Sequence, residues 1–565
     1  MKEFPVRLTS YRSFVLALCA LAASTLARAE TVTAPPKPAI GTNTVAVADP
    51  LVTRPHTQPC VVELLGEHEF VGDKPVAMAY APPAGCPGPW AKVVIEADFH
   101  VTKGRQFDRT AIINLGGVNL YLGTTMEPRR DIAPAWHAER DITDYAALLT
   151  TAQDGEFLLA NYLDDTYTGH LYGQARLVFY PAEAGQTPPA TAQLVLPLTD
   201  HLTSLDKATP SLSKTVTLPR NIERLYLDVM AEPQGDDEFW YGCVSDRFVT
   251  DGSNLCGGGS LRETEVSIDG APAGVAPVYP WIYTGGINPY LWFPSPAVQT
   301  LNFEPYRVDL TPFAATLNDG KPHTVSLQVY GVRRYVFAMG TLMAWLDEGR
   351  DVVTGALTRN TLGQPPVKVD DTGLTAKGSD LNGKMATTAD RDYEIAGYVD
   401  TSHGRVTTRL QQTSAFVNRQ TFTTSSTDNV WRLQQATTLK TVVTTTDAGG
   451  VHRKVIDESF PLTVHQHDKL GADYGLEDID VYQGLQRTVR DTGPDGRTLS
   501  RATELSQSPR LHALTDPKTH RTKTSTSTSI HHVKIVGSDG TCYDRTITSR
   551  NNTVTAVTDA CPVIP

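Results

Sequence analysis

The apolar and polar positions of this chain alternate over many short segments. Period-two or β-branched runs occupy residues 92–99, 111–121, 175–180, 224–230, 265–269 and 324–330. Glycine, proline, asparagine and aspartate separate these runs, which is typical of strands joined by turns. Amphipathic helical patterns are scarce, and residues 142–149 form the best short candidate. The pattern therefore predicts an all-β protein.

The chain is long enough for several domains, because its 565 residues exceed a usual domain of roughly 100 to 200 residues. Short strands at this spacing favour antiparallel sandwiches or jelly rolls, and breaks fall near residues 215 and 350. Beyond the second break threonine and serine become frequent, which suits solvent-facing strands. We predict a core of two antiparallel jelly-roll or β-sandwich domains, residues 59–214 and 215–350, and a C-terminal β-rich accessory region, residues 351–565.

The N-terminus has the pattern of a secretory signal peptide. Basic residues precede an apolar run over residues 14–26, which closes on Ala27-Arg28-Ala29. The run is about half the length that would span a bilayer, which disfavours the alternative of a retained anchor. We predict a signal peptide at residues 1–29 and a secreted or periplasmic protein with no membrane partner. Residues 30–58 are rich in proline, threonine and alanine and are expected to form an extended, poorly ordered leader.

The cysteines suit an oxidising compartment. Of the seven, Cys19 would leave with the signal peptide, and an even number would remain. Six cysteines allow 15 pairings, and these six fall into couples that are close in sequence. We predict the bridges Cys60–Cys86, Cys243–Cys256 and Cys542–Cys561; free buried thiols are the alternative. None of the cysteines has the CxxC spacing of a zinc or redox site.

The charge of the chain narrows the class of its partners. A formal net charge of −12 offers no basic patch to neutralise phosphates, which argues against nucleic acid. A polar, uncharged substrate such as a glycan is compatible with it.

Several segments between residues 92 and 347, in their order and spacing, resemble the peptide:N-glycosidase A family. They are Lys103-Gly104-Arg105-Gln106-Phe107-Asp108-Arg109, Asn114-Leu115-Gly116-Gly117-Val118, Asn161-Tyr162-Leu163-Asp164-Asp165, Glu238-Phe239-Trp240-Tyr241, Arg262-Glu263, Tyr283-Thr284-Gly285-Gly286-Ile287-Asn288-Pro289, Asp309-Leu310-Thr311-Pro312-Phe313 and Trp345-Leu346-Asp347. The resemblance covers a little under half of the chain, and residues after about 350 match only loosely.

This resemblance implies an enzyme that hydrolyses the amide bond between asparagine and the innermost N-acetylglucosamine of an N-linked glycopeptide or glycoprotein. Asparagine becomes aspartate and a glycosylamine leaves, without a metal or another cofactor and often at acidic pH. The core is similar to that of peptide:N-glycosidase F, a two-jelly-roll enzyme whose catalytic aspartate lies in a Trp-Asp-Arg step that opens a strand. Here Phe107-Asp108-Arg109 occupies the similar place.

Amide hydrolysis itself requires residues of these types. Water needs a carboxylate base, the developing oxyanion needs a donor, and the leaving nitrogen needs a proton. Asp108 is the candidate base or water-positioning group, and Arg109 is the candidate donor to the substrate. Adjacent residues on a regular strand point to opposite faces, so this pair is expected at a strand end or a bulge.

A second carboxyl group is expected from Glu238 or Glu263. Glu238 stands beside Trp240 and Tyr241, aromatic neighbours that would raise its pKa by desolvation; an ordinary acidic loop residue is the alternative. For Glu263 the alternation of the strand points the other way. It places Arg262 on the core face and Glu263 on the opposite face. The alternative for Arg262 is therefore a structural role, as the partner of a buried acid.

The remaining candidates are substrate contacts, each with a structural role as the alternative. They are Arg262, Asn161, Asp164, Trp240 and Trp292. His465 and His467 would share one face of a strand, but a third metal ligand is not visible, so no metal site is predicted. The C-terminal region is expected to brace the catalytic pair or to contact the substrate.

Two other classes of function share much of this pattern. A glycan-binding β-sandwich protein without activity would have the same fold, acidity and aromatic residues, but it needs no paired carboxyl groups. An endo-glycoside hydrolase would use the same carboxyl groups on the chitobiose core and would leave one sugar on asparagine. The state of the asparagine after treatment separates the three interpretations.

Overall fold

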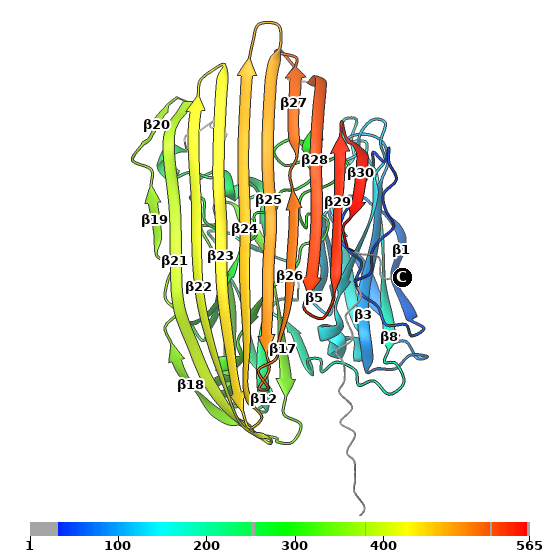
Figure 1. Cartoon of the computed structure of the whole chain (residues 1–565), viewed down its shortest axis with the longest axis vertical. Coiled ribbons are helices and arrows are strands. Elements are labelled where there is room, and N and C mark those ends of the chain that lie inside the picture. The colour runs from blue at the N-terminus through cyan, green and yellow to red at the C-terminus, as the bar shows by residue number, and fades with distance from the viewer. Residues whose placement is uncertain (1–31, 201, 250–254, 379, 520–521, 562–565) are drawn as a thin grey trace, which may run out of the picture.

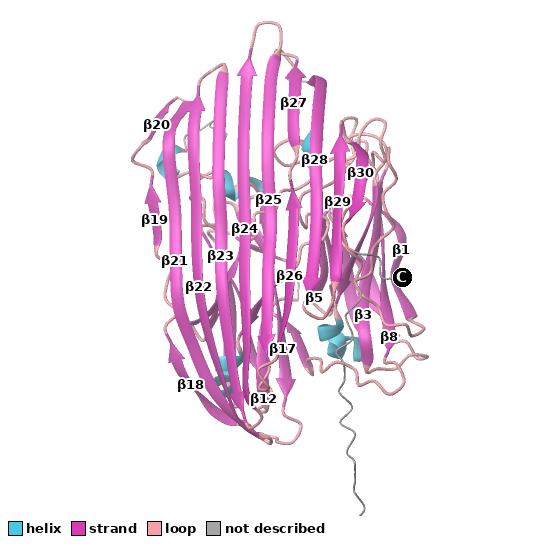
Figure 2. Cartoon of the chain, viewed as in Figure 1, coloured by secondary structure: helices cyan, strands magenta, loops and turns pink. Residues whose placement is uncertain are grey.

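The computed structural model describes residues 32–200, 202–249, 255–378, 380–519 and 522–561. Within these residues the chain is built of strands with a few short helices, as Figure 2 shows. The all-β prediction is confirmed. The predicted signal peptide, residues 1–29, lies outside the described residues.

The first sandwich consists of two antiparallel sheets. One has the order β1-β8-β3-β6 and the other β2-β7-β4-β5. Their bounds are β1 Cys60–Phe70, β2 Val76–Tyr80, β3 Trp90–Val101, β4 Thr110–Leu115, β5 Val118–Thr124, β6 Ala135–Asp141, β7 Gln153–Leu159 and β8 Leu171–Pro181. Alternate residues such as Ile95 and Ile113 point between the sheets and form one apolar core. Residues 142–149, the predicted helix, match the 3-10 helix η1 (Thr143–Thr150).

The second sandwich also has two antiparallel sheets. One sheet has the order β10-β17-β12-β15, and β9 also pairs with β17. The other sheet has the order β11-β16-β13-β14. The strands are β9 Leu194–Pro197, β10 Thr203–Leu205, β11 Ser211–Thr217, β12 Ile222–Gln234, β13 Glu263–Ile268, β14 Ala271–Pro277, β15 Tyr306–Asp309, β16 Pro322–Tyr330 and β17 Tyr335–Leu346. Five of the short helices belong here: η2 Gly235–Asp237, η3 Trp240–Gly242, η4 Asp246–Phe248, η5 Pro289–Leu291 and η6 Thr311–Phe313, which leads into α1 Ala314–Leu317.

The strand pairing places the start of the second sandwich before the predicted boundary at residue 215. Strands β9 and β10 pair with β17, and β11 pairs with β16. Residues 194–217 therefore belong to sheets whose other strands come later in the chain. A change in composition at residue 215 carries no information about such long-range pairing, which is why the sequence placed the boundary too late.

The C-terminal region forms a single long sheet. In the described residues it comprises β18–β30, with the order β18-β21-β22-β23-β24-β25-β26-β28-β29-β30. The short strands β19 and β20 pair with β21, as β18 does, and β27 lies between β25 and β28. The bounds are β18 Thr354–Asn360, β19 Val367–Asp370, β20 Leu374–Lys377, β21 Asp380–Thr401, β22 Gly404–Thr424, β23 Asp428–Asp447, β24 Gly450–Leu470, β25 Gly475–Thr492, β26 Thr498–Gln507, β27 Arg510–Thr515, β28 Thr522–Gly537, β29 Cys542–Arg550 and β30 Thr553–Asp559. Figure 1 shows its longest strands side by side, with green segments of the second sandwich behind them.

One face of this sheet shares a core with the second sandwich. Leu410 and Phe416 of β22 and Leu433 of β23 are buried in the same apolar cluster as Leu227 and Val266 of the second sandwich. The accessory region therefore covers the second sandwich over much of its length.

A smaller apolar cluster joins all three parts of the molecule. Ile112 of β4, Met230 of β12, Met339 of β17 and Phe460 of β24 are buried together. Because alternate residues of a strand share a face, Thr110 of β4 and Glu232 of β12 lie on the same sides as Ile112 and Met230. Two polar side chains are thereby directed to the boundary between the two sandwiches.

The predicted disulfide pairing is confirmed. Cys60–Cys86, Cys243–Cys256 and Cys542–Cys561 are bonded in the structure. No helix in the described part of the chain is long and apolar enough to cross a membrane.

The predicted poorly ordered leader is wrong for residues 32–58, which pack against the folded body. Ala46 is 2% and Ala48 0% exposed. The backbone N–H of Gly41 donates to Val554 O at 2.9 Å, and the hydroxyl of Tyr543 donates to Ala48 O. A proline-rich composition shows that a segment has no core of its own, but it does not exclude docking on a surface that other strands provide.

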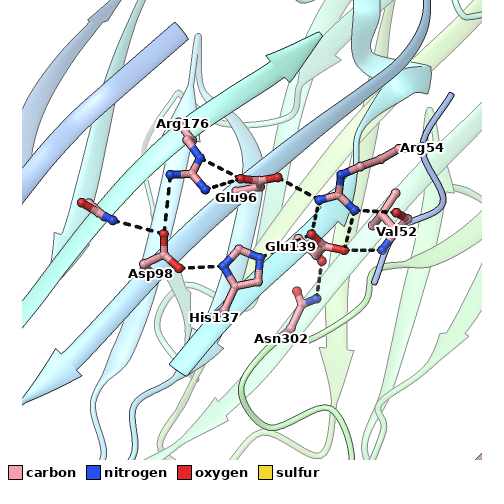
Figure 3. Close-up of polar contacts among 9 residues, drawn as sticks. Val52, Arg54, Glu96, Asp98, His137, Glu139, Arg176 and Asn302 are labelled. Carbon is pink, nitrogen blue, oxygen red and sulfur yellow. Dashed lines mark hydrogen bonds and ion pairs between the residues drawn. The ribbon is translucent and has the colours of Figure 1, made fainter. Parts of the chain in front are cut away.

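The end of the leader is held by an ion-pair network on the outer face of the first sandwich (Figure 3). Arg54 donates to Glu96 Oε1 at 2.8 Å and to both carboxyl oxygens of Glu139, which also accepts the backbone N–H of Val52. Burial alone would raise the pKa of Glu139, but hydrogen bonds from His137 and Arg54 lower it below its usual range. The network therefore depends on a charged Arg54.

Replacing Arg54 by methionine keeps much of its bulk and removes one cation from two nearly buried carboxylates, of which Glu96 keeps Arg176 and Glu139 keeps His137 as a partner. We expect the free energy of unfolding to fall by about 2 kcal/mol, less than for a fully buried pair because Arg54 is partly solvated. Urea denaturation measures it, and limited proteolysis should cut residues 32–58 first. Equal stability and an unchanged cleavage pattern would show that the leader is held by its other contacts alone.

Candidate active site

Four carboxyl groups meet at the boundary between the two sandwiches. Asp108 and Glu127 come from the first sandwich, and Glu232 and Glu238 from the second. Asp108 contributes to the pKa of each of the other three, so the four groups are electrostatically coupled.

Asp108 lies directly before β4, in agreement with the prediction that Asp108 and Arg109 sit at a strand end. Its Oδ2 accepts the backbone N–H of Gly285 from the second sandwich at 2.8 Å. The backbone N–H of Asp108 lowers the pKa of Glu127, against the larger effects of burial and of the Asp108 charge. The orientation of Asp108 is thus set from both sandwiches.

Gly285 is required by this packing. A Cβ atom at this position would clash with Oε1 of Glu127 and would lie 3.3 Å from Oδ1 of Asp108. Only a residue without a side chain lets the backbone pass this close to Glu127 while its N–H donates to Asp108.

The carboxyl groups hold protons more tightly than in water. Burial, followed by repulsion from Asp108 and Glu127, raises the pKa of Glu238 to about 8. Burial and the charge of Asp108 likewise raise the pKa of Glu127 to about 8. Burial also raises the pKa of Asp108, against the opposing effects of the Gly285 N–H and Arg109. Because close like charges cannot all ionise, the cluster retains protons that pass out in coupled steps.

Glu232 is the most deeply buried member, with 0% exposure. Its Oε1 accepts from Thr110 Oγ1 at 2.8 Å, and Thr110 Oγ1 accepts from Gln234 Nε2 at 3.0 Å. Burial is the main cause that raises the pKa of Glu232 to about 8. This neutral acid links β4 of one sandwich to β12 of the other.

Arg109 lies on the open side of Asp108. Its Nη2 donates to Gln106 Oε1 at 2.9 Å, and the guanidinium lies over the rings of Phe107 and Tyr162, 5.5 Å and 5.7 Å from their centroids. Its Nε is buried and has no hydrogen-bond partner among the described residues. Arg109 therefore keeps one N–H donor that no described residue uses.

Two predicted substrate contacts support Arg109 and its surroundings instead. Asn161 is 0% exposed, and its Oδ1 accepts from Gln106 Nε2 at 2.6 Å, which orients the partner of Arg109. The carboxylate of Asp164 accepts the backbone N–H groups of Thr166 and Tyr167, both at 2.7 Å, and so forms the turn of its loop. Asn161 thus uses its polar atoms in the interior, whereas Asp164 is exposed and uses Oδ1 within its own loop.

Arg262 does not reach the substrate. Its side chain is fully buried and forms an ion pair with Asp237 at 2.7 Å, while its Nη1 donates to Gly259 O at 2.9 Å. This is the structural alternative that the strand alternation allowed, and it corrects the assignment of Arg262 to substrate binding.

Glu263 is not brought to Asp108. Its carboxyl group pairs with Arg391 of β21, and burial, offset by Arg391, raises its pKa. The groups that act on it are Arg391 and Glu265, not the carboxyl cluster. Glu263 therefore ties β13 to the C-terminal sheet, and the catalytic assignment is corrected in favour of Glu238.

The two predicted tryptophan contacts are also buried. Trp240 is 1% exposed and lies 6.3 Å from the ring of Phe416 in the C-terminal sheet. Trp292 is 0% exposed and its Nε1 donates to Gly286 O at 2.7 Å, which shapes the loop that carries Gly285. Neither ring offers a face to a sugar.

Sequence reasoning missed Glu127, Glu232 and the exposed aromatic residues. The sequence offered one indication of Glu232, which is a charged residue two positions after Met230 in an otherwise apolar run of β12. Glu127 follows β5 in a loop and carries no periodic signal. Two exposed rings lie against Arg109: Phe107, 42% exposed, and Tyr162, 52% exposed. In the described part of the chain, no group of three histidine, cysteine, aspartate or glutamate side chains is arranged to hold a metal ion.

Comparison with known families and proteins gives one family. The model for "Peptide N-acetyl-beta-D-glucosaminyl asparaginase amidase A" matches residues 50–360. Among curated proteins, peptide-N4-(N-acetyl-beta-glucosaminyl)asparagine amidase A from Prunus dulcis is 31% identical over 389 residues, which are 64% of this chain and 67% of the relative.

Solved structures give weaker likenesses. PNGase F, a glycosylasparaginase from Flavobacterium meningosepticum, is 14% identical, and the match covers 51% of this chain and 96% of that chain with a TM-score of 0.34. PNGF-II is 11% identical, with 56% and 66% covered and a TM-score of 0.32. TM-scores of this size do not establish a shared fold.

The buried pair Arg262–Asp237 generates a stability prediction. Arg262→Met leaves Asp237 buried without its cation, and we expect a loss of about 3 kcal/mol in the free energy of unfolding. Arg333→Met is the matched control, because Arg333 pairs with Asp246 at the surface and should contribute less than about 1 kcal/mol. Denaturation midpoints that fall equally in the two variants would contradict the burial argument.

Proposed function

Because the chain belongs to the peptide N-acetyl-beta-D-glucosaminyl asparaginase amidase A family, we propose that it hydrolyses the amide bond between asparagine and the innermost N-acetylglucosamine of N-linked glycopeptides or glycoproteins. The observation that carries the proposal is the coupled pair of Asp108 and Glu238. Burial raises the pKa of both groups, but only at Asp108 do a backbone N–H and an arginine oppose that effect.

The surroundings of the two groups suit opposite roles. Burial raises the pKa of Asp108, whereas the N–H of Gly285 and the cationic Arg109 oppose burial and favour the charged form. Glu238 has a pKa raised to about 8 by burial and by neighbouring carboxylates, so it is protonated at neutral and acidic pH. Paired carboxyl groups with separated pKa values are the usual arrangement for a base and an acid in one site.

The reaction follows from these roles. Asp108 orients water and accepts its proton as the oxygen attacks the carbonyl carbon of the asparagine side chain. Arg109 donates to the oxyanion that develops, and Glu238 gives its proton to the nitrogen as the carbon–nitrogen bond breaks. The peptide keeps aspartate, the sugar leaves as a glycosylamine, and water supplies the added oxygen and hydrogen atoms.

The exposed rings next to Asp108 suit a sugar. Phe107 and Tyr162 flank the guanidinium of Arg109, and Tyr167 lies 4.7 Å from the ring of Phe107. Aromatic faces pack against the apolar faces of sugar rings while polar groups bind the hydroxyls. These rings replace Trp240 and Trp292 as the proposed contacts.

The proposed place of action is outside the cytoplasm, either secreted or periplasmic. The three disulfides support an oxidising compartment. The signal-like sequence at residues 1–29 supports export. The net charge of −12 disfavours nucleic acid as a partner.

The function is tested by mass spectrometry of a treated N-glycopeptide. Conversion of asparagine to aspartate, with loss of the whole glycan, is the expected result. One N-acetylglucosamine left on asparagine would make the protein an endo-glycoside hydrolase, and an unchanged glycopeptide would make it a binding protein.

Asp108→Asn tests the base. The amide keeps the size of the side chain but cannot accept the proton, so we expect kcat to fall by a factor of at least about 100 with the thermal midpoint unchanged. The exposed Asp131→Asn is the control for loss of one negative charge. Turnover above a tenth of the wild-type value would move the base to another carboxyl group.

The pH profile tests the acid. Activity requires ionised Asp108, whose pKa is raised above 3.8, and protonated Glu238, whose pKa is about 8. Activity should therefore rise as pH increases through the pKa of Asp108, fall as pH approaches and passes 8, and peak below neutral pH. Measured kcat/KM over this range checks it, and an optimum above pH 8 would exclude Glu238 as the proton donor.

A further inference from the structure

The segment that carries Glu238 is an irregular loop. Residues 235–248 run through the short helices η2, η3 and η4 and are tied at Cys243 to Cys256. Among the described residues, no group donates a hydrogen bond to the Glu238 carboxyl. Its position is therefore set by the backbone that bears it and by packing.

The C-terminal sheet reaches this loop with two amide side chains of β22. Asn418 Nδ2 donates to Tyr241 O at 2.7 Å, and Gln420 Nε2 donates to Cys243 O at 3.1 Å. Asn418 is 0% and Gln420 1% exposed. The two side chains bind alternate carbonyls of one loop, because alternate residues of a strand share a face.

These amides stand between apolar neighbours on the same face, Phe416 and Phe422. A buried amide destabilises the fold unless its hydrogen bonds are made, so apolar residues would serve a purely packing role better. The carbonyls of Tyr241 and Cys243 belong to no strand ladder and need donors from elsewhere. The NH2 groups of the two amides thus match the carbonyls of this loop, while Oδ1 of Asn418 has no hydrogen-bond partner among the described residues.

Trp431 of β23 fixes the second contact. Its Nε1 donates to Gln420 Oε1 at 3.0 Å, which orients the amide so that Nε2 faces Cys243. A Cβ atom at Gly242 would lie 3.0 Å from the indole ring, so the loop backbone rests directly on Trp431.

Short turns connect these anchor points to Glu238. Cys243 N donates to Trp240 O at 3.1 Å, Gly242 N to Phe239 O at 2.7 Å, and Glu238 N to Gly235 O at 3.1 Å. A shift of the Tyr241 or Cys243 carbonyl is therefore passed to the backbone of Glu238 rather than absorbed.

We propose that Asn418 and Gln420 are positioning residues for the reaction, which hold the loop of Glu238 so that its carboxyl group faces Asp108. The C-terminal sheet is then part of the catalytic apparatus, because it supplies the fixed surface from which the acid is placed. This inference rests on the proposed amidase function.

Gln420→Met tests it, since methionine keeps the length of the side chain and removes the donor. We expect kcat to fall about tenfold or more with KM changed less than about twofold, because misplacement of an acid affects the transition state more than binding. Asn418→Leu is the second variant and should act in the same direction. Both are measured with a glycopeptide and compared at equal folded fraction.

Gln412→Met is the matched control. Gln412 lies on the same face of β22, is 4% exposed, and is bonded to Tyr393 and Thr441, away from residues 235–248. It should lower the thermal midpoint as Gln420→Met does and leave kcat within about twofold of wild type, because it has no path to Glu238. Equal losses of kcat in the two variants would reduce the role of Gln420 to stability and overturn the inference.

The pH dependence of kcat/KM is a second measurement, and a loss of stability alone should not change it. Besides burial, the charges of Asp108 and Glu127 raise the pKa of Glu238. The charge of Glu238 in turn raises the pKa values of Glu232, Tyr241, Tyr283 and Tyr335. A displaced Glu238 would experience these groups differently, so Gln420→Met should shift the basic limb of kcat/KM, and Gln412→Met should not.

A double-mutant cycle separates this inference from the proposed function. If Gln420 acts through Glu238, Gln420→Met should have little further effect on kcat in an E238Q background. Full additivity would overturn the inference while wild-type deglycosylation still supported the function. If the wild-type protein leaves the glycopeptide unchanged, the proposed function fails first, and the inference fails with it.

Discussion

The site depends on the crowding of Asp108, Glu127, Glu232 and Glu238 at the boundary of two sandwiches. Each group alone would ionise in water at its usual pKa, and burial together with mutual repulsion prevents this. The cost of holding them is met by specific contacts, among them the N–H of Gly285 on Asp108 and the hydroxyl of Thr110 on Glu232. The resulting cluster can hold an anion and an acid side by side, which amide hydrolysis needs.

Much of the architecture followed from local signals. Period-two alternation predicted the strands, and cysteines close in sequence predicted the bridges. On β13 the same alternation placed Arg262 inside and Glu263 opposite, as the structure has them. The start of the second sandwich and the docking of residues 32–58 were missed, because both depend on partners far along the chain.

The candidate site was predicted only in part, for the same physical reason. Asp108, Arg109 and Glu238 stood in segments that resemble a family, whereas Glu127 acquires its role only when β5 and the Gly285 loop meet. Trp240 and Trp292 were expected to bind sugar because they are aromatic and near the site in sequence. Both rings are buried in the structure, and burial depends on how the whole molecule is assembled. The contacts of the C-terminal sheet could not be predicted for the same reason, because Asn418 and Gln420 each bind a residue 177 positions earlier in the sequence.

The central claim is that Glu238 is held as a neutral acid beside Asp108. Difference infrared spectroscopy of the wild-type protein against E238Q, taken near pH 6, reports it directly, because a protonated carboxyl group has a carbonyl stretch that a carboxylate lacks. We predict a protonated carboxyl band that is missing in E238Q and that disappears from the wild type as pH rises through about 8. A carboxylate signal assigned to Glu238 at pH 6 would contradict it.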